Sequence, residues 1–526
     1  MRKLLPLATA ALTLPGAVLA ADVPSPKRPP NVIVIIADDL GYGDVSCNGQ
    51  GKIRTPNIDR MAAEGMRLTD GYAPASTCTP TRYGLITGEY AWRKRGTGIL
   101  PGDAALIISP SRTTLPKIFQ RAGYATAAVG KWHLGLGDGK LDFNGRITPG
   151  LNELGFDYAF NMAATGDRVP CVYMENGRVV NLDPADPISV SYGKKVGDWP
   201  SGRNHPELLR MKSNEGHADT IVNGIGRIGY MTGGKSALWD DRTLSDTFNA
   251  KAIEFIRKNK AKPFFLYYAA HEPHVPRDPN PRFVGKSGVG ARGDAVLQFD
   301  DQVARLLGTL KAEGLDDNTL VILSSDNGTA VADGYADGAL ENETKAGHRG
   351  NGVYRGGKYG DFEGGLRMPF LARWPDRIKP GSVSASPVCL TDLAATAAAI
   401  TGQKLAPADA PDSFNILPVL TDGAKSPRDF LLFGNPGRHL KASALREGKW
   451  KLILNPQQPH SLRRNPASDS PAPAGAPLLF DLEADPTESN NLAAKHPDLV
   501  KRLTEKLEAA SAAGFTRPGA ARVESR

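Results

Sequence analysis

Residues 31–39 read Asn31-Val32-Ile33-Val34-Ile35-Ile36-Ala37-Asp38-Asp39, and this stretch decides the fold class. Its first seven residues are mostly β-branched and show no alternation of polar and apolar side chains. Such a run is typical of a strand that is buried on both faces of a parallel sheet. The run ends abruptly at two carboxylates, so the sequence predicts Asp38 and Asp39 at the carboxyl end of a central strand.

A helix is expected next. Thr55 and Pro56 suit the N-cap and first position of a helix that runs through Met61. Gly65 suits its end, because glycine adopts the left-handed conformation that often closes a helix. The order is therefore strand, then helix.

The same pattern recurs three times further along the chain. In each case a helical stretch leads into an apolar run, and the run ends in polar residues: 124–129 before Lys131 and His133, 263–268 before His271 and His274, and 320–323 before Asp326 and Asn327. Alternating strands and helices predict an α/β fold, with a large, mixed, mostly parallel sheet flanked by helices on both faces. An Asp after one strand is often only a turn residue. Four polar clusters at one edge of a sheet indicate a ligand site.

The alternation fades after about residue 425. Residues 444–454 read as a hairpin with a turn at Gly448, residues 498–510 as an amphipathic helix, and 456–477 as a loop rich in Pro, Ser and Ala. We therefore expect a main domain over residues 21–427. A smaller C-terminal subdomain with an antiparallel sheet and a helix is expected over 428–526.

The amino terminus predicts export. Arg2 and Lys3 precede a mainly apolar stretch that ends at Ala20, with Val18 two places earlier, which fits a signal peptide over residues 1–20. Pro6 and Pro15 interrupt this stretch, and it is shorter than the roughly 20 apolar residues that a membrane span needs. The expected location is the periplasm or outside the cell, with no membrane span.

Composition limits the classes of partner. The 526 residues, 40% hydrophobic and 23% charged, match an ordinary globular protein. Cleavage after Ala20 would remove two cations and lower the net charge from +8 to +6. Because the basic residues are spread out, the charge favours an anionic substrate and argues against nucleic acid.

The most specific motif is Cys78-Thr79-Pro80-Thr81-Arg82, which continues to Gly88. A lone cysteine is more often a small buried hydrophobe or half of a disulfide. This run, however, resembles the maturation signature of the sulfatase family, in which the cysteine is converted to formylglycine. The resemblance extends over five separated motifs in order, from Asp38 to Lys358, and the C-terminal architecture agrees with it.

The resemblance implies a nucleophile and a metal. An aldehyde at position 78 would hydrate to a diol, in which one hydroxyl attacks sulfur and the other expels sulfate afterwards. The implied metal ligands are Asp38, Asp39, residue 78, Asp326 and Asn327. These are hard oxygen donors, so they favour Ca²⁺, or alternatively Mg²⁺, over zinc.

The resemblance also implies roles for the basic residues. Arg82 and Lys131 would orient the diol, and His133 would be the base that lets sulfate leave. Lys358 and His274 would hold the ester, with His274 as the acid for the leaving alcohol. His271 is left out of this catalytic set.

The expected activity is hydrolysis of a sulfate ester on a sulfated sugar of the galactose or N-acetylgalactosamine type, with the 4-O and 6-O positions both open. The expected partners are a sulfated carbohydrate and a formylglycine-generating or anaerobic sulfatase-maturating enzyme. Thr165 to Arg168 and the stretch around His348 and Arg349 are candidate substrate-binding loops.

Two alternatives stay open. One is a phosphonate monoester or phosphodiester hydrolase of the same superfamily. The other is a sulfated-glycan binder in which Cys78 stays unconverted. If Cys78 is converted, Cys47, Cys171 and Cys389 allow at most one disulfide, and their spacing does not choose the pair.

Overall fold

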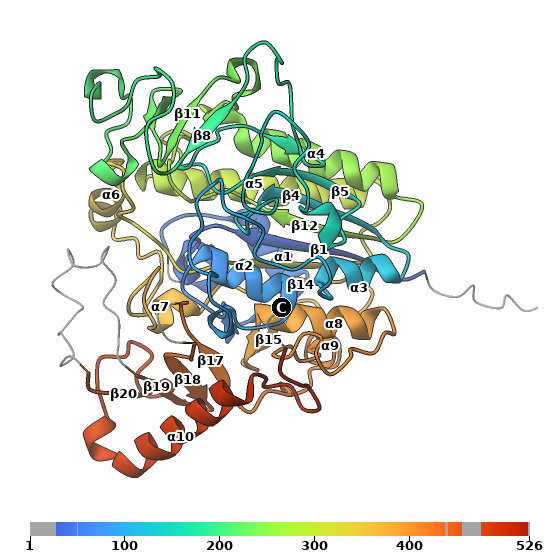
Figure 1. Ribbon diagram of the computed structural model, residues 1–526. Coiled ribbons are helices and arrows are strands. Elements are labelled where there is room, and N and C mark those ends of the chain that lie inside the picture. Colours follow the sequence, from blue (N-terminus) through green and yellow to red (C-terminus); the bar gives the residue numbers. More distant parts are fainter. Residues whose placement is uncertain (1–27, 50, 437–439, 455–474, 524–526) are drawn as a thin grey trace, which may run out of the picture.

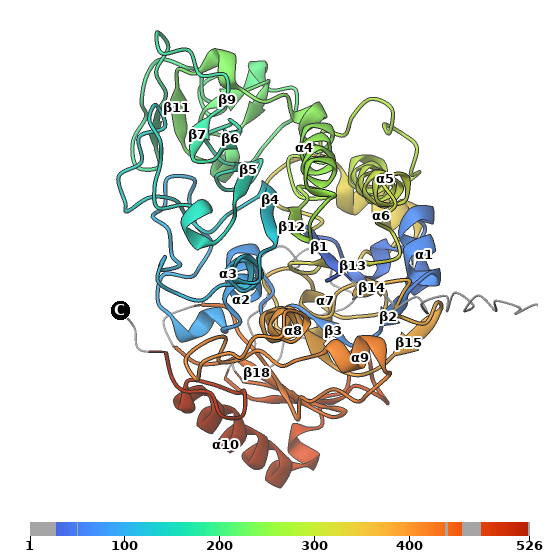
Figure 2. The same ribbon diagram turned by 90° about the vertical axis from the view of Figure 1, so that its right-hand side faces the viewer.

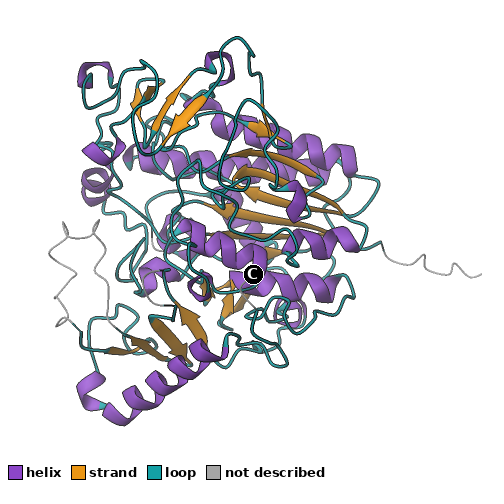
Figure 3. Cartoon of the chain, viewed as in Figure 1, coloured by secondary structure: helices purple, strands orange, loops and turns teal. Residues whose placement is uncertain are grey.

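The computed structural model describes residues 28–49, 51–436, 440–454 and 475–523. The expected signal peptide and most of the expected Pro-rich loop lie outside these ranges. The fold is built on two sheets (Figures 1 and 3). The larger has ten strands in the order β15-β2-β14-β13-β1-β12-β4-β5-β6-β7, and a smaller one has four in the order β17-β18-β19-β20.

Five parallel strands form the centre of the large sheet: β1 (Asn31–Ala37), β4 (Ala125–Lys131), β5 (Tyr158–Met162), β12 (Phe264–Ala269) and β13 (Thr319–Ser325). On one side, β14 (Leu371–Arg373) and β2 (Met66–Leu68) join in antiparallel fashion, and β15 (Ser382–Ser384) pairs with β2 in parallel. On the other side are the short antiparallel strands β6 (Met174–Glu175) and β7 (Arg178–Val179). The prediction of a mixed, mostly parallel sheet is confirmed.

The pleat of β1 explains its uninterrupted apolar sequence. Val32, Val34 and Ile36 belong to the core beneath α2 (Cys78–Thr87), α3 (Leu115–Arg121) and α8 (Leu393–Ile400). Ile33 and Ile35 point the other way, into the core beneath α1 (Pro56–Ala63), α4 (Leu244–Asn259) and α5 (Gly290–Ala312). Figure 2 shows these two helix groups on opposite faces of the sheet. Both faces of the strand are therefore dry, as the sequence predicts.

The expected helix end at Gly65 needs a correction. Helix α1 ends at Ala63 with Glu64 in a right-handed C-cap, and Gly65 is not left-handed. A Cβ at Gly65 would instead lie 2.3 Å from the carbonyl oxygen of Ala372 in β14. The glycine is needed for close approach of two backbones, not for helix capping.

The C-terminal strands form the predicted antiparallel sheet: β17 (Leu431–Phe433), β18 (Ala444–Glu447), β19 (Trp450–Ile453) and β20 (Leu478–Asp481). One face, including Phe433 and Ile453, packs on residues of the main domain such as Tyr72. The other face packs beneath Leu503 and Leu507 of α10 (Pro497–Ala513). Successive side chains of each strand point to opposite faces of the sheet. One face therefore packs against α10 and the other against the main domain.

Two further features concern the described residues. None of the helices in these ranges is both long and apolar enough to cross a bilayer. All four cysteines are free thiols.

Candidate active site

The polar residues predicted at the carboxyl edge of the large sheet lie together. Asp38 and Asp39 follow β1, and Asp326 and Asn327 follow the neighbouring strand β13. The amide nitrogen of Asp39 donates to Asp326 Oδ1 at 3.3 Å, and Asn327 Nδ2 donates to Asp39 Oδ1 at 2.7 Å. All four side chains are fully buried. Three carboxylates therefore share one cluster without bulk water.

Three cations face these carboxylates, and each contacts a different one. The contacts are Arg82 Nη2 to Asp326 at 2.7 Å, Lys131 Nζ to Asp38 at 2.5 Å, and Lys358 Nζ to Asp39 at 3.0 Å. Arg82 lies one turn after Cys78 on α2, and its Nη1 donates to the hydroxyl of Tyr267 at 3.2 Å. The carboxylates are thus held by opposite charges from three different elements.

Two oxygens of the cluster lack a hydrogen-bond partner although they are buried: Asp38 Oδ1 and Asn327 Oδ1. Burial, and after it the neighbouring Asp326, raises the pKa of Asp38 well above its usual value despite Lys131. A cation that prefers oxygen ligands would satisfy both oxygens and favour the charged form of Asp38. The residues present therefore fit the Ca²⁺ or Mg²⁺ that the sequence predicts.

Cys78 is the first residue of α2, and Thr77 before it is extended. Its sulfur belongs to a group of ligand atoms, with Asp38, Asp39 and His274, that all lie within 4.8 Å of one another. Burial raises the pKa of the Cys78 thiol to about 12. At neutral pH the side chain is therefore a protonated thiol, which is a poor nucleophile and a poor metal ligand.

Three residues other than glycine adopt left-handed backbone conformations in this site: Asp39 with φ 63°, His133 with φ 58° and Tyr359 with φ 74°. Such conformations are uncommon for these residue types and cost on the order of 1 kcal/mol or more each. Strain of this kind clusters where side chains must be aimed at a ligand.

His133 presents one free nitrogen. Its Nε2 lies 2.9 Å from the carbonyl oxygen of Leu100, so Nε2 carries the proton, and Nδ1 is buried without a partner. Burial, and after it Lys131, lowers the pKa of His133 well below its usual value. The hydroxyl of Thr79 donates to the His133 carbonyl at 2.9 Å and ties this residue to α2. A neutral imidazole with an available lone pair suits a general base.

His274 has the opposite arrangement. Its Nδ1 lies 2.6 Å from the carbonyl oxygen of Val275, and its Nε2 accepts from Lys358 Nζ at 3.2 Å. Burial, and after it Lys358, lowers the pKa of His274 well below its usual value. The imidazole is therefore neutral, and the nearest proton donor is the Lys358 ammonium. Lys358 also donates to Asp333 at 2.8 Å.

Some residues that shape the site are absent from the sequence prediction. Asp333 lies in a loop without a pattern. Asn435, between β17 and β18, accepts from the amide of Ser76 at 3.2 Å and from the hydroxyl of Thr77 at 3.0 Å, and it donates to Ser76 Oγ at 2.8 Å. The C-terminal subdomain thus holds the two residues directly before Cys78. The only sequence signal was the turn sequence Gly434-Asn435-Pro436.

The two predicted substrate loops differ. Thr165 Oγ1 lies 3.2 Å from His274 Nδ1, and Asp167 accepts from Arg168 at 2.7 Å and lies 3.3 Å from His217 Nε2. This loop therefore borders the site. His271, which was left out of the catalytic set, is packed against Gly166, where a Cβ would lie 2.3 Å from its Nε2.

His348, from the second predicted loop, belongs to a separate buried cluster. Its Nε2 lies 2.9 Å from Asp44 Oδ1, and Arg292 Nη1 donates to Asp44 at 2.8 Å and to Glu343 at 2.7 Å. Arg292 also donates to the carbonyl oxygen of Asp39 at 3.3 Å. We call these four residues, Asp44, Arg292, Glu343 and His348, the Arg292 cluster. It lies behind Asp39, to which it is linked by the bond from Arg292.

Comparison with known proteins agrees with this geometry. Residues 30–403 match the sequence model of the family named Sulfatase. The chain is 48% identical over 486 residues to an N-acetylgalactosamine-6-O-sulfatase of Bacteroides thetaiotaomicron, covering 92% of this chain and 93% of that protein. It is 33% identical over 498 residues to human arylsulfatase A, covering 91% and 87%. A solved structure from the metabolism of multiple glycosaminoglycans by Bacteroides thetaiotaomicron superposes with a TM-score of 0.86 at 47% identity, covering 92% of this chain and all of the other.

Proposed function

This chain belongs to the sulfatase family, and on that premise we propose that it removes the 6-O-sulfate from N-acetylgalactosamine or a related galactose-type sugar. Hydrolysis of sulfate esters is the family-level activity, and the sulfated sugar follows from the N-acetylgalactosamine-6-O-sulfatase to which the chain is similar. The 6-O position rests on the relative that is 48% identical over most of both chains. The observation that carries the proposal is the buried group in which Cys78, three carboxylates and three cations meet.

The nucleophile that we propose is formylglycine made from Cys78. An unmodified thiol with a pKa of about 12 would be inert here. The hydrated aldehyde supplies one hydroxyl that attacks sulfur and a second that expels sulfate and regenerates the aldehyde. This requires a maturating enzyme as a partner.

The metal that we propose is Ca²⁺, with Mg²⁺ as the alternative, held by Asp38, Asp39, Asp326, Asn327 and residue 78. When bound, it would withdraw charge from the sulfate oxygens. Asp38 Oδ1 and Asn327 Oδ1 support this assignment, because they are buried and without partners.

The side chains around residue 78 receive the following roles. Arg82 and Lys131 orient its hydroxyls, and His133 Nδ1 takes the proton of the second hydroxyl as sulfate leaves. Lys358 and His274 hold the ester. Because His274 is neutral, we assign protonation of the leaving alcohol to the hydrogen-bonded Lys358–His274 pair, with Asp333 positioning the ammonium.

The sugar would lie against the loop of Thr165 to Arg168. Asp167 and Arg168 are largely buried and close to the site, and a carboxylate beside a guanidinium offers acceptors and donors to sugar hydroxyls. Export to the periplasm or beyond also belongs to this proposal, and it depends on the expected signal peptide over residues 1–20.

The proposal can be tested on protein coexpressed with a maturating enzyme. The mass of the peptide around residue 78 should be about 18 Da below that of the thiol form, the difference between a thiol and an aldehyde at this carbon. That protein should release sulfate from 6-sulfated N-acetylgalactosamine but not from the 4-sulfated sugar, and a chelator should stop the release.

Faster turnover of an aryl phosphonate than of any sulfate ester would instead support the phosphonate hydrolase alternative. Tight binding of sulfated glycan by protein with an unmodified Cys78 and no turnover would support the glycan-binder alternative.

A further inference from the structure

A hollow lies at the surface where the start of α1 and the loop before α5 meet α5. It has a volume of about 400 Å³. Residues 52–57 and residues 283–287 form two of its sides, and α5 forms the third. Its lining is Lys52, Arg54, Pro56, Asn57, Phe283, Lys286, Ser287, Leu297, Asp300 and Asp301. These segments leave the carboxyl ends of β1 and β12, the strands that also deliver Asp39 and His274, and α1 and α5 lie side by side in Figure 2.

The acids of this hollow are already satisfied. Asp300 accepts from the backbone amides of Asn57 and Ile58, at 3.1 and 2.8 Å, and so caps α1. Asp301 lies 2.8 Å from Arg305. Neither carboxylate needs a further cation.

The cations of this hollow are free by contrast. Lys52, Arg54 and Lys286 are exposed, and none of the ion pairs found among the described residues includes them. Phe283 is half-buried beside them. The Arg282 guanidinium lies over one face of its ring, 4.6 Å from the centroid, and the ring, Pro56 and Leu297 provide an apolar surface. Three unpaired cations around an aromatic ring form a surface for a ligand that has a flat apolar face and negative groups.

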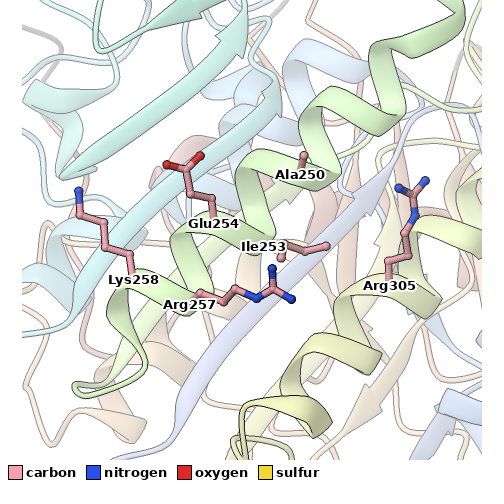
Figure 4. Close-up of a pocket in the computed structure, with 6 residues that line it drawn as sticks. All are labelled: Ala250, Ile253, Glu254, Arg257, Lys258 and Arg305. Atoms are coloured by element: carbon pink, nitrogen blue, oxygen red, sulfur yellow. The ribbon is translucent and has the colours of Figure 1, made fainter.

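The larger hollow between α4 and α5 differs in this respect. It has a volume of about 650 Å³, and its charged side chains project from two neighbouring helices (Figure 4). Arg257 lies 3.1 Å from Glu313, and Arg305 is paired with Asp301. Because two of its three cations are already paired, it offers fewer unpaired cations to a ligand.

The hollow of Lys52 is connected to the active site through the Arg292 cluster. The backbone amide of Lys52 donates to His348 Nδ1 at 3.1 Å, and the other nitrogen of His348 contacts Asp44. Arg292 links Asp44 to the carbonyl of Asp39. A short chain of hydrogen bonds and ion pairs thus runs from the backbone of Lys52 to the proposed metal ligand Asp39.

We propose that Lys52, Arg54, Lys286 and Phe283 form an accessory site for an anionic sugar residue, a uronate or a second sulfated sugar, of the polysaccharide whose ester is cleaved. This inference rests on the proposed function for the identity of the polymer. The charge complementarity and the sugar-sized hollow carry it. The cations pair with carboxylate or sulfate groups, and Phe283 packs against a sugar ring.

The test uses matured full-length protein and chondroitin 6-sulfate, a polymer of alternating uronate and 6-sulfated N-acetylgalactosamine. The variant is Lys52→Ala/Arg54→Ala/Lys286→Ala. The matched control is Lys404→Ala/Lys425→Ala/Lys501→Ala, which removes the same charge from exposed lysines on the side of α8, α9 and α10. Binding is measured by titration calorimetry, and turnover is measured on the 6-sulfated monosaccharide.

The first variant should bind the polymer about tenfold more weakly, from three exposed charge contacts, while the control stays within about twofold. Both should hydrolyse the monosaccharide as the wild type does. High salt should remove the difference between variant and wild type, because it screens exposed charges. Phe283→Ala should weaken polymer binding without changing its salt dependence.

Unchanged polymer binding in the first variant, or an equal loss in both triple variants, would overturn the accessory site. Failure of the proposed function gives a different result. In that case the wild type would release no sulfate from the monosaccharide, yet polymer binding would still fall only in the first variant, which would support the accessory site.

Discussion

Two buried clusters of acids lie next to each other in this protein, and they differ in charge balance. In the candidate active site, two buried oxygens lack a hydrogen-bond partner: Asp38 Oδ1 and Asn327 Oδ1. In the Arg292 cluster, Arg292 donates to both oxygens of Asp44 and to Glu343, and His348 Nε2 also contacts Asp44 Oδ1. Either group offers enough close ligand atoms to suggest a metal.

The pKa values of Asp38 and Asp44 express the same difference, while burial raises the pKa of Glu343 as it does that of Asp38. Burial and Asp326 raise the pKa of Asp38. Burial also acts on Asp44, but Arg292 and His348 outweigh it and lower the pKa of Asp44 below its usual value. Buried oxygens without partners, rather than the number of acids, therefore distinguish the cluster that can accept a cation from the Arg292 cluster.

The largest expected effect is on catalysis. Asp39→Asn should lower kcat/KM by about 10³-fold or more, because it removes the negative charge of a proposed metal ligand and of the partner of Lys358. The fold should remain, since an amide of the same shape replaces a charge. Glu343→Gln, the matched change in the Arg292 cluster, should lower kcat/KM less than about tenfold. Equal losses in the two variants would remove the distinction between the clusters.

The next effect is on stability. Arg292→Met should lower the free energy of unfolding by about 3–5 kcal/mol, because it leaves two buried acids without their cation. Urea denaturation of the metal-free proteins measures this. Arg305→Met, which removes a half-exposed arginine from the same helix, should cost about 1 kcal/mol or less. A loss no greater in Arg292→Met than in Arg305→Met would contradict the balance that we assign to this cluster.

A smaller effect concerns the C-terminal subdomain. Asn435→Ala should lower the free energy of unfolding by about 1–2 kcal/mol, from lost hydrogen bonds to Ser76 and Thr77. It should also reduce kcat more than it changes KM, because Ser76 and Thr77 set the position of residue 78. A change in KM with kcat unchanged would show that Asn435 affects the substrate pocket instead.

The smallest effect is on the pH dependence of stability in the metal-free protein. The folded state keeps a proton on Asp38 that the unfolded chain releases, so this residue destabilises the fold as pH rises above about 4. Asp44 has the opposite sign, and its contribution is lost as pH falls below that value. The midpoint temperature of thermal unfolding should therefore fall less toward neutral pH in Asp38→Asn than in the wild type. It should fall less toward acid pH in Asp44→Asn than in the wild type. A flatter acid limb in Asp38→Asn and a flatter neutral limb in Asp44→Asn would contradict the two pKa shifts.

Much of this site was predictable because its residues follow buried parallel strands. Uninterrupted β-branched runs mark such strands, and topology brings their carboxyl ends together, so Asp38, Lys131, His274 and Asp326 could be placed at one edge. Cys78 came from a linear motif. None of these predictions needed knowledge of long-range packing.

The rest depends on contacts between distant segments. Asn435 meets Ser76 across more than 350 residues, and a turn sequence gives no sign of its partner. His348 was expected in a substrate loop, because sequence does not show that a histidine in a glycine-rich stretch is buried beside Asp44. The neutral state of His274 likewise follows from burial and from Lys358 beside it.

The calcium content of two variants tests the central claim most directly. Wild type and Glu343→Gln, dialysed in calcium and analysed by mass spectrometry, should each carry one Ca²⁺ per chain, whereas Asp38→Asn should carry none. Calcium retained in Asp38→Asn and lost in Glu343→Gln would place the metal in the Arg292 cluster and contradict the proposed active site.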